Sequence, residues 1–125
     1  MARSTATRPV VLIVEDEFLI RTHAAEVIRD AGFEVAEATN ADEAIVILES
    51  RRDIRVVFTD IQLPGSMDGL KLARAVRDRW PPVHIVATSG HQAIQEGDLP
   101  AGSVFFSKPY SPEKVATTLF ALIAS

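Results

Sequence analysis

The stretch "RVVFTDIQLPGSMDG", residues 55–69, holds the feature that decides the fold. Its apolar run at residues 56–58 is typical of a strand that is covered on both faces of a parallel sheet. The run ends at a carboxylate, Asp60, after which the chain turns at Pro64-Gly65 and restarts with a helical pattern. A strand built for a buried sheet that ends on an acid calls for a chemical reason, and the rest of the sequence supplies one.

Short apolar runs alternate with amphipathic helical patterns along the whole chain. This alternation predicts an α/β domain built on a doubly wound parallel sheet. We expect strands at residues 10–14, 34–38, 54–59, 83–88 and 103–107, and helices from Ile20 to a stop at Gly32, from a cap at Asn40, from Leu70 to Pro81-Pro82, and from Ser111 onward. The segment from His91 to Gly102 is interrupted by glycine and proline, so we expect the fourth helix to be short or degenerate.

Composition narrows the class of protein. A chain of 125 residues that is 47% hydrophobic fits one domain with a real core. The net charge of −4 argues against non-specific binding of nucleic acid. The absence of cysteine excludes a disulfide framework and a thiolate metal site, and it fits a cytoplasmic location. No window approaches the roughly 20 apolar residues that a membrane span needs.

The ends of the predicted strands carry the polar chemistry. Ligand sites of open parallel sheets lie beyond the carboxyl ends of the strands. These ends carry acids, hydroxyls and an ammonium: Glu15, Asp16 and Glu17 after the first strand, Asp60 at the end of the third, Thr88 and Ser89 at the fourth, and Lys108 followed by Pro109 after the fifth. The inner strands therefore bring opposite charges to one edge of the sheet.

Carboxylates that crowd at one edge repel each other, and burial increases the cost of their charge. A hard divalent cation among them relieves this, and a set of oxygen ligands favours Mg²⁺ over zinc. Lys108 and the hydroxyl of Thr88 would hold phosphoryl oxygens, and a carboxylate is a competent phosphoryl acceptor. The set predicts phosphoryl transfer onto one aspartate with the help of Mg²⁺, and Asp60 is the best candidate because its strand should be central.

Four motifs, "VLIVEDE", "VVFTDIQLPGSMDG", "VATSG" and "FFSKP", resemble in their order and spacing the receiver domain of two-component response regulators. The resemblance begins near Pro9 and covers the rest of the chain. It implies a flavodoxin-like (β/α)5 fold with strand order 2-1-3-4-5. We expect a flexible segment at residues 1–8 and a single receiver domain at residues 9–125. No output domain is expected within these residues, and both a stand-alone regulator and a part of a longer regulator are consistent with the sequence.

The resemblance also assigns the acidic residues. Asp60 would be the phosphoacceptor, and Asp16 would be the main carboxylate ligand of Mg²⁺. Glu15 would assist through water, and Gln62 would lend its backbone carbonyl to the metal. Glu15 stands where the family usually has aspartate.

The remaining site residues follow from the same resemblance. Thr88 would be the switch hydroxyl, and Lys108 would bind the phosphoryl group. Phe105, three residues before the lysine, falls at the aromatic switch position of the family. The peptide bond between Lys108 and Pro109 would be cis.

A histidine kinase or a histidine phosphotransfer protein would donate the phosphoryl group. The domain would then act as a regulator that catalyses only its own phosphotransfer and autodephosphorylation, with a downstream protein target that the sequence does not name. Two alternatives remain. A Mg²⁺ phosphohydrolase of the haloacid-dehalogenase type needs a second aspartate where this chain has Gln62, and a cap for which there is no sequence. A phosphorylation-independent pseudo-receiver would not need the acids together with Thr88 and Lys108.

The loop after Asp60 differs from the family pattern. Where receivers usually read Pro-x-Met-Asp-Gly, this chain reads "PGSMDG", with one extra residue. This loop is the first place where we expect a departure from an ordinary receiver.

Overall fold

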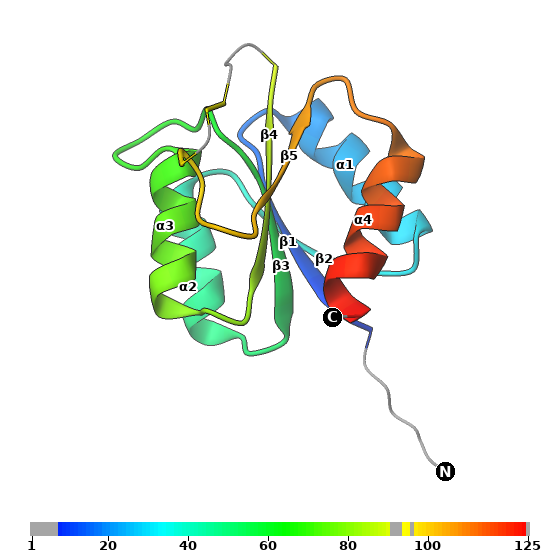
Figure 1. Ribbon diagram of the computed structural model, residues 1–125, viewed down its shortest axis with the longest axis horizontal. Coiled ribbons are helices and arrows are strands. Elements are labelled where there is room, and N and C mark those ends of the chain that lie inside the picture. Colours follow the sequence, from blue (N-terminus) through cyan, green and yellow to red (C-terminus); the bar gives the residue numbers. More distant parts are fainter. Residues whose placement is uncertain (1–7, 91–93, 96, 125) are drawn as a thin grey trace.

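A five-stranded parallel sheet lies between two layers of helices in the computed structural model, which describes residues 8–90, 94–95 and 97–124 (Figure 1). The strands are β1 (Val10–Val14), β2 (Glu34–Ala38), β3 (Ile54–Asp60), β4 (His84–Ser89) and β5 (Val104–Ser107). The helices are α1 (Phe18–Asp30), α2 (Ala41–Ser50), α3 (Gly69–Arg79) and α4 (Pro112–Ala124). The strand order β2-β1-β3-β4-β5 confirms the predicted doubly wound fold.

The two faces of the sheet are covered by different helices. Helices α2 and α3 lie on one face, and α1 and α4 lie on the other (Figure 1). Side chains alternate along a strand, so Leu12 and Val14 of β1 join the core on the α2–α3 side, whereas Val11 and Ile13 join the core on the α1–α4 side. This double burial is why β1 and β3 are almost continuously apolar.

Local sequence signals set the helix ends. Helix α1 stops where Gly32 adopts a φ of 104°, a conformation that glycine reaches without strain. Asn40 is the N-cap of helix α2, and its side-chain oxygen accepts a hydrogen bond from the backbone N–H of Glu43 at 2.8 Å. The carboxylate of Glu43 reaches back one residue further than in a standard capping box and accepts from the N–H of Thr39 at 2.7 Å.

The loop between β3 and α3 brings the helix against the end of the strand. Gly65 has a φ of 96°, and the exposed residues 64–66 leave room for the extra residue on the solvent side. The N–H of Gly69 donates to the carbonyl of Ile61 at 2.8 Å. A Cβ at Gly69 would collide with the carbonyl oxygen of Asp60 and lie 2.6 Å from the Cα of Ile61. Glycine therefore permits the first residue of α3 to touch the end of β3.

Two sequence predictions fall partly outside the described residues. The flexible segment at residues 1–8 overlaps residues 1–7, and the short helix after His91 overlaps residues 91–93 and 96. The described residues 97–102 form turns and bends rather than helix. Within the described part of the chain, no helix combines the length and the apolar character of a membrane span.

Candidate functional site: an acidic cluster with a shared lysine

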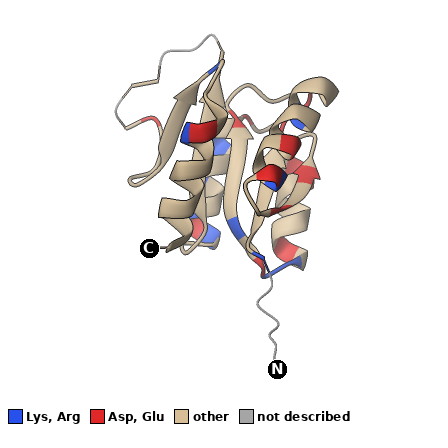
Figure 2. Ribbon diagram, turned by 90° about the vertical axis from the view of Figure 1, so that its right-hand side faces the viewer, with Lys and Arg blue, Asp and Glu red and all other residues tan. Residues whose placement is uncertain are grey.

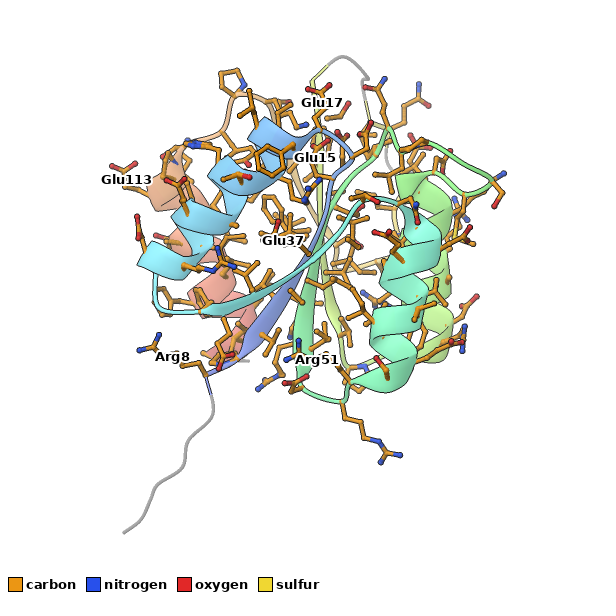
Figure 3. All side chains as sticks on the ribbon, turned by 180° about the vertical axis from the view of Figure 1, so that it is seen from behind. Arg8, Glu15, Glu17, Glu37, Arg51 and Glu113 are labelled. Atoms are coloured by element: carbon orange, nitrogen blue, oxygen red, sulfur yellow. The ribbon has the colours of Figure 1, made fainter. Side chains whose placement is uncertain are left out.

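The polar residues expected at the strand ends meet at one edge of the sheet. Glu15 directly follows β1, Asp60 is the last residue of β3, and Lys108 directly follows β5. Thr88 pairs with Asp60 in the register of β3 and β4. Figure 3 shows Glu15 near the upper end of the sheet, and Figure 2 shows acidic segments at that end.

Lys108 joins two carboxylates that come from neighbouring strands. Its Nζ donates to Oε1 of Glu15 at 3.0 Å and to Oδ2 of Asp60 at 2.9 Å. Both acids are buried, with 4% of Glu15 and 8% of Asp60 exposed. One ammonium thus neutralises part of the charge of two acids that would otherwise repel each other.

Backbone N–H groups hold the second oxygen of each carboxylate. The N–H of Gln62 donates to Oδ1 of Asp60 at 3.0 Å. The N–H of Glu17 donates to Oε2 of Glu15 at 3.1 Å. The two carboxylates are therefore oriented by their own loops on one side and by the lysine on the other.

Burial and hydrogen bonding act in opposite directions on these groups. Burial holds the pKa of Glu15 above its usual value, and the hydrogen bonds from Glu17 and Lys108 offset this only in part. Burial also lowers the pKa of Lys108, but its hydrogen bonds to Asp60 and Glu15 outweigh that effect and leave the pKa raised. The lysine is therefore a fixed positive charge, while Glu15 is an acid that additional positive charge would stabilise in its ionised form.

Three acids lie close enough together to share a metal ion. Glu15, Asp16 and Asp60 each offer a carboxylate oxygen, and these oxygens all lie within 4.8 Å of one another. The side toward Asp16 is exposed, whereas Glu15 and Asp60 are buried. An all-oxygen set that is open to water on one side fits Mg²⁺, which keeps several water ligands.

Thr88 and Lys108 border the same small cavity. Thr88 is buried, and with Glu15, Asp60, Lys108 and Tyr110 it lines a narrow space at the edge of the sheet. The backbone N–H of Lys108 donates to the carbonyl of Ser89 at 2.9 Å, which fixes the start of the loop after β5.

The other residues that the resemblance singled out lie nearby. The peptide bond between Lys108 and Pro109 is cis. Phe105 is half-buried on β5, where it pairs with Ala87, the residue before Thr88. Gln62 lies at the site, and the contact that the structure records for it is the N–H bond to Asp60.

Sequence reasoning missed two residues that shape the site. The guanidinium of Arg21 donates to the carbonyl of Glu15 at 2.9 Å and pairs with Glu37 at 3.1 Å, so it ties the loop after β1 to β2. Tyr110 packs edge-on against Phe58 with ring centroids 5.7 Å apart. An arginine one turn into the first helix and the aromatic residue after Lys108-Pro109 were the available signals.

Comparison with known proteins identifies the class. A family model described as the response regulator receiver domain matches residues 11–120. The chain therefore belongs to the receiver domain family of two-component response regulators, and its role is that of a phosphoacceptor signalling domain. This confirms the resemblance that the four motifs indicated.

Particular relatives share this region of sequence or this fold. The chain is 34% identical over 113 residues to a putative NtrX-like response regulator of Rickettsia bellii, a match that covers 87% of this chain and 23% of the relative. It is 33% identical over 113 residues to the sensor kinase CckA of Brucella abortus, which covers 87% of this chain and 12% of the kinase. The crystal structure of a response regulator receiver protein from Sinorhizobium medicae superposes with a TM-score of 0.88 at 28% identity, over 97% of this chain and 98% of that one. The chain thus spans a quarter or less of these two curated relatives.

Proposed function

We propose that Asp60 accepts a phosphoryl group from the phosphohistidine of a histidine kinase or of a histidine phosphotransfer protein. The observation that carries the proposal is the position of its carboxylate. Oδ2 of Asp60 contacts the ammonium of Lys108 at 2.9 Å, and the same side chain belongs to the group of three acids that fits a metal ion. A phosphoryl group on this carboxylate would therefore meet positive charge at once.

Mg²⁺ is the cofactor that the donor set supports. Asp16, Glu15 and Asp60 would hold it, together with the backbone carbonyl of Gln62. When bound, it would neutralise negative charge on the phosphoryl oxygens and on the carboxylates. The loops that orient Glu15 and Asp60 fix these donors before any ligand arrives, and such preorganisation is the main contribution that a protein makes to phosphoryl transfer.

The transfer exchanges one bond to phosphorus for another. A carboxylate oxygen of Asp60 forms a bond to phosphorus as the bond between phosphorus and the imidazole nitrogen breaks, and the imidazole leaves with that electron pair. The ammonium of Lys108 would hold one phosphoryl oxygen by charge, and the hydroxyl of Thr88 would donate a hydrogen bond to another. Attack of water on phosphorus would then break its bond to the carboxylate oxygen of Asp60 and release inorganic phosphate, which is the autodephosphorylation that we assign to the domain.

Thr88 and Phe105 would carry the signal away from the site. Thr88 is buried beside Asp60, and Phe105 lies half-buried on the neighbouring strand, one position back. If Thr88 moves toward the phosphoryl group, the space that it leaves becomes available to the ring of Phe105. A rotamer change of this kind alters the surface around β4 and β5 with little motion of the backbone.

The surface beside Lys108 fits the partner that donates the phosphoryl group. Leu19, Ile20 and His23 of α1 line an open groove together with Pro109 and Tyr110. Phe18 and Leu19 are 66% and 78% exposed side by side at the start of α1, and a contiguous exposed apolar surface is typical of a site where a partner binds. The groove adjoins the acceptor, so a helix that presents a phosphohistidine would rest there. We also propose a cytoplasmic location for the domain, because the ATP that phosphorylates a histidine kinase is found there.

Incubation with acetyl phosphate and Mg²⁺, followed by intact mass measurement, tests the assignment. We expect a single phosphoryl adduct that EDTA prevents, that decays with time, and that Asp60→Asn abolishes. Asp53→Asn is the matched control, because Asp53 is an exposed acid that pairs with Arg51 away from the site. Continuous phosphate release from a substrate panel without an adduct would favour the hydrolase. The absence of an adduct, with partner binding unchanged in Asp60→Asn, would favour the pseudo-receiver.

A further inference from the structure

A second groove lies at the opposite end of the sheet. It has a volume of about 500 Å³ and runs between the carboxyl ends of α2 and α3, the first residues of β3, and Val83, which directly precedes β4. Figure 3 shows Arg51 at this lower end, with the labelled acids Glu15 and Glu17 at the upper end. The groove is therefore separated from Asp60 by the length of the strands.

Arginine side chains dominate the charge of this groove. Four of the 13 lysine and arginine residues of the chain line it, and Glu49 is the one acid in the described lining. The lining arginines are Arg51, Arg52, Arg55 and Arg79. A positive groove in a chain with a net charge of −4 is a local concentration of charge rather than a property of the whole surface.

The four arginines are not equally engaged. Arg79 pairs with Glu49 at 2.7 Å, and Arg51 pairs with Asp53 at 2.7 Å. Within the described part of the chain, neither Arg52 nor Arg55 has an ion pair with a carboxylate, and Arg55 donates to the carbonyl of Ile123 at 3.3 Å. Two guanidinium groups therefore have donors available for carboxylates from outside the domain.

The floor of the groove is apolar and rigid. Trp80 lies in it half-buried, with the guanidinium of Arg79 stacked 4.4 Å from its ring centroid. Pro81 and Pro82 follow directly and fix the backbone of the rim. Tryptophan and arginine are the residues most enriched where protein partners bind strongly, so this combination favours a protein ligand.

The pKa of a nearby histidine also reflects the positive charge at this end of the sheet. His84, the first residue of β4, is half-buried beside this end of the sheet. Burial, together with the positive charges of Arg55 and Arg77, lowers its pKa. The arginines thus create a positive electrostatic potential at this end of the sheet, and this potential disfavours protonation of His84.

We propose that this arginine-lined groove binds an acidic peptide segment of a partner protein, with an apolar side chain on the Trp80 floor and flanking carboxylates on Arg52 and Arg55. The ends of α2 and α3 that face the groove are carboxyl ends, which present carbonyl groups rather than the N–H groups that cradle phosphate. A long polyanion such as nucleic acid would also meet the repulsion of a net negative domain. A short acidic peptide meets neither obstacle.

A displayed library of random ten-residue peptides, selected on the whole chain, tests this inference. We expect enrichment of peptides in which acids flank an aliphatic or aromatic residue. A synthetic peptide from the enriched set should lose at least tenfold in affinity, measured by calorimetry, on Arg52→Glu and on Arg52→Glu/Arg55→Glu. Arg29→Glu is the control, because Arg29 is an exposed arginine of α1 that does not line the groove.

Other results overturn the proposal. Enrichment of non-acidic peptides, no enrichment, or equal affinity for the wild type and the Arg52→Glu variant would each exclude an acidic peptide at this groove. Tighter binding of a single-stranded oligonucleotide or of inorganic phosphate than of the peptide would point to a different ligand. Arg52→Glu breaks no hydrogen bond among the residues that the structure describes, and phosphorylation by acetyl phosphate provides a check that the variants are folded.

Discussion

The two ends of the sheet both concentrate charge, but they do so under opposite conditions. At the carboxyl end, Glu15 and Asp60 are 4% and 8% exposed and share the ammonium of Lys108. At the amino end, the side chains of Arg51 and Arg79 are 39% and 49% exposed and pair with exposed acids. Charges removed from water interact strongly and are costly when a partner is missing, whereas charges in water are screened. The buried carboxylates at the carboxyl end of the sheet therefore need a cation to balance their charge. The exposed arginines at the amino end are stable in water without one carboxylate for each guanidinium.

The largest expected effect comes from removal of the shared lysine. Lys108→Met leaves two buried carboxylates without their ammonium, and we expect a loss of about 2–3 kcal/mol in the free energy of unfolding, since the side chain of Lys108 is partly exposed. Urea denaturation without divalent ions measures this, and added Mg²⁺ should restore part of the loss. Lys71→Met, at an exposed position of α3, is the control. If Lys108→Met lost no more unfolding free energy than Lys71→Met, the buried charges at the carboxyl end of the sheet would contribute no more to stability than exposed charges do.

The next effect concerns backbone contact rather than charge. Gly69→Ala introduces a Cβ that collides with the carbonyl oxygen of Asp60, so we expect a loss of about 2 kcal/mol. The rate of adduct formation with acetyl phosphate should fall as well, because Asp60 itself must shift. Ser66→Ala, in the exposed part of the same loop, should change stability by less than about 0.5 kcal/mol. Equal stability of the two variants would show that the backbone between β3 and α3 can move to accept a Cβ at residue 69 without a loss of folding free energy.

A smaller effect is expected at the start of α2. Asn40→Ala removes the acceptor that caps the N–H of Glu43, which should cost about 1 kcal/mol in urea denaturation. Asn40 follows β2 and so lies toward the same end of the sheet as the acidic cluster. Adduct formation on Asp60 should be unchanged in this variant. A parallel loss of phosphorylation would mean that the cap and the cluster are coupled.

Glu43 provides a pH test within the same end of the sheet. Hydrogen bonds from the backbone and the hydroxyl of Thr39 hold its pKa below the usual value, in contrast to the raised pKa of buried Glu15. A lowered folded-state pKa adds stability above the unfolded-state value of about 4.3, and this stability is lost as the pH falls through the folded-state pKa. Glu43→Gln should therefore be slightly less stable than the wild type at pH 7, by no more than about 0.5 kcal/mol at this exposed site. The difference should shrink toward pH 3, and a difference that grows with acid would contradict the assignment.

The smallest effect should be found at the arginine-rich end. Glu49→Gln breaks the ion pair with Arg79, yet both side chains are 49% exposed, so stability should change by less than about 0.5 kcal/mol. The same substitution frees a guanidinium at the groove, and affinity for a selected acidic peptide should rise. Differential scanning calorimetry of the variant and the wild type measures the change in stability, and titration calorimetry with the selected peptide measures the change in affinity. A large loss of stability would show that exposed pairs at this end matter as much as the buried ones.

The strands, and the edge of the sheet at which the site residues meet, were predictable because both depend on local sequence patterns. Continuous apolar runs identify strands that are covered on both faces, and the parallel arrangement then gathers Glu15, Asp60, Thr88 and Lys108 at one edge. The predicted cap of α2 at Asn40 is confirmed for the same local reason.

The contacts that join distant segments were not predictable from spacing. The bond of Arg21 to the carbonyl of Glu15 and the packing of Tyr110 on Phe58 depend on how helices settle against the sheet. Gly69 was read as part of a motif, whereas its role is to allow contact with the backbone of Asp60. The groove at the amino end combines residues of α2, α3, β3 and the segments that precede β3 and β4, and these residues show no common pattern in the sequence.

The path of the chain has a practical consequence for measurement. β1 starts and α4 finishes at the end of the sheet that lies away from Asp60 (Figure 1). A fluorescent protein or a surface tether joined before β1 or after α4 would therefore leave the phosphoryl acceptor open to its donor. The same arrangement invites circular permutation, with a linker between the old termini and a new opening in the exposed loop at residues 64–66. Such a permutant would place its reporters beside the acceptor instead of far from it.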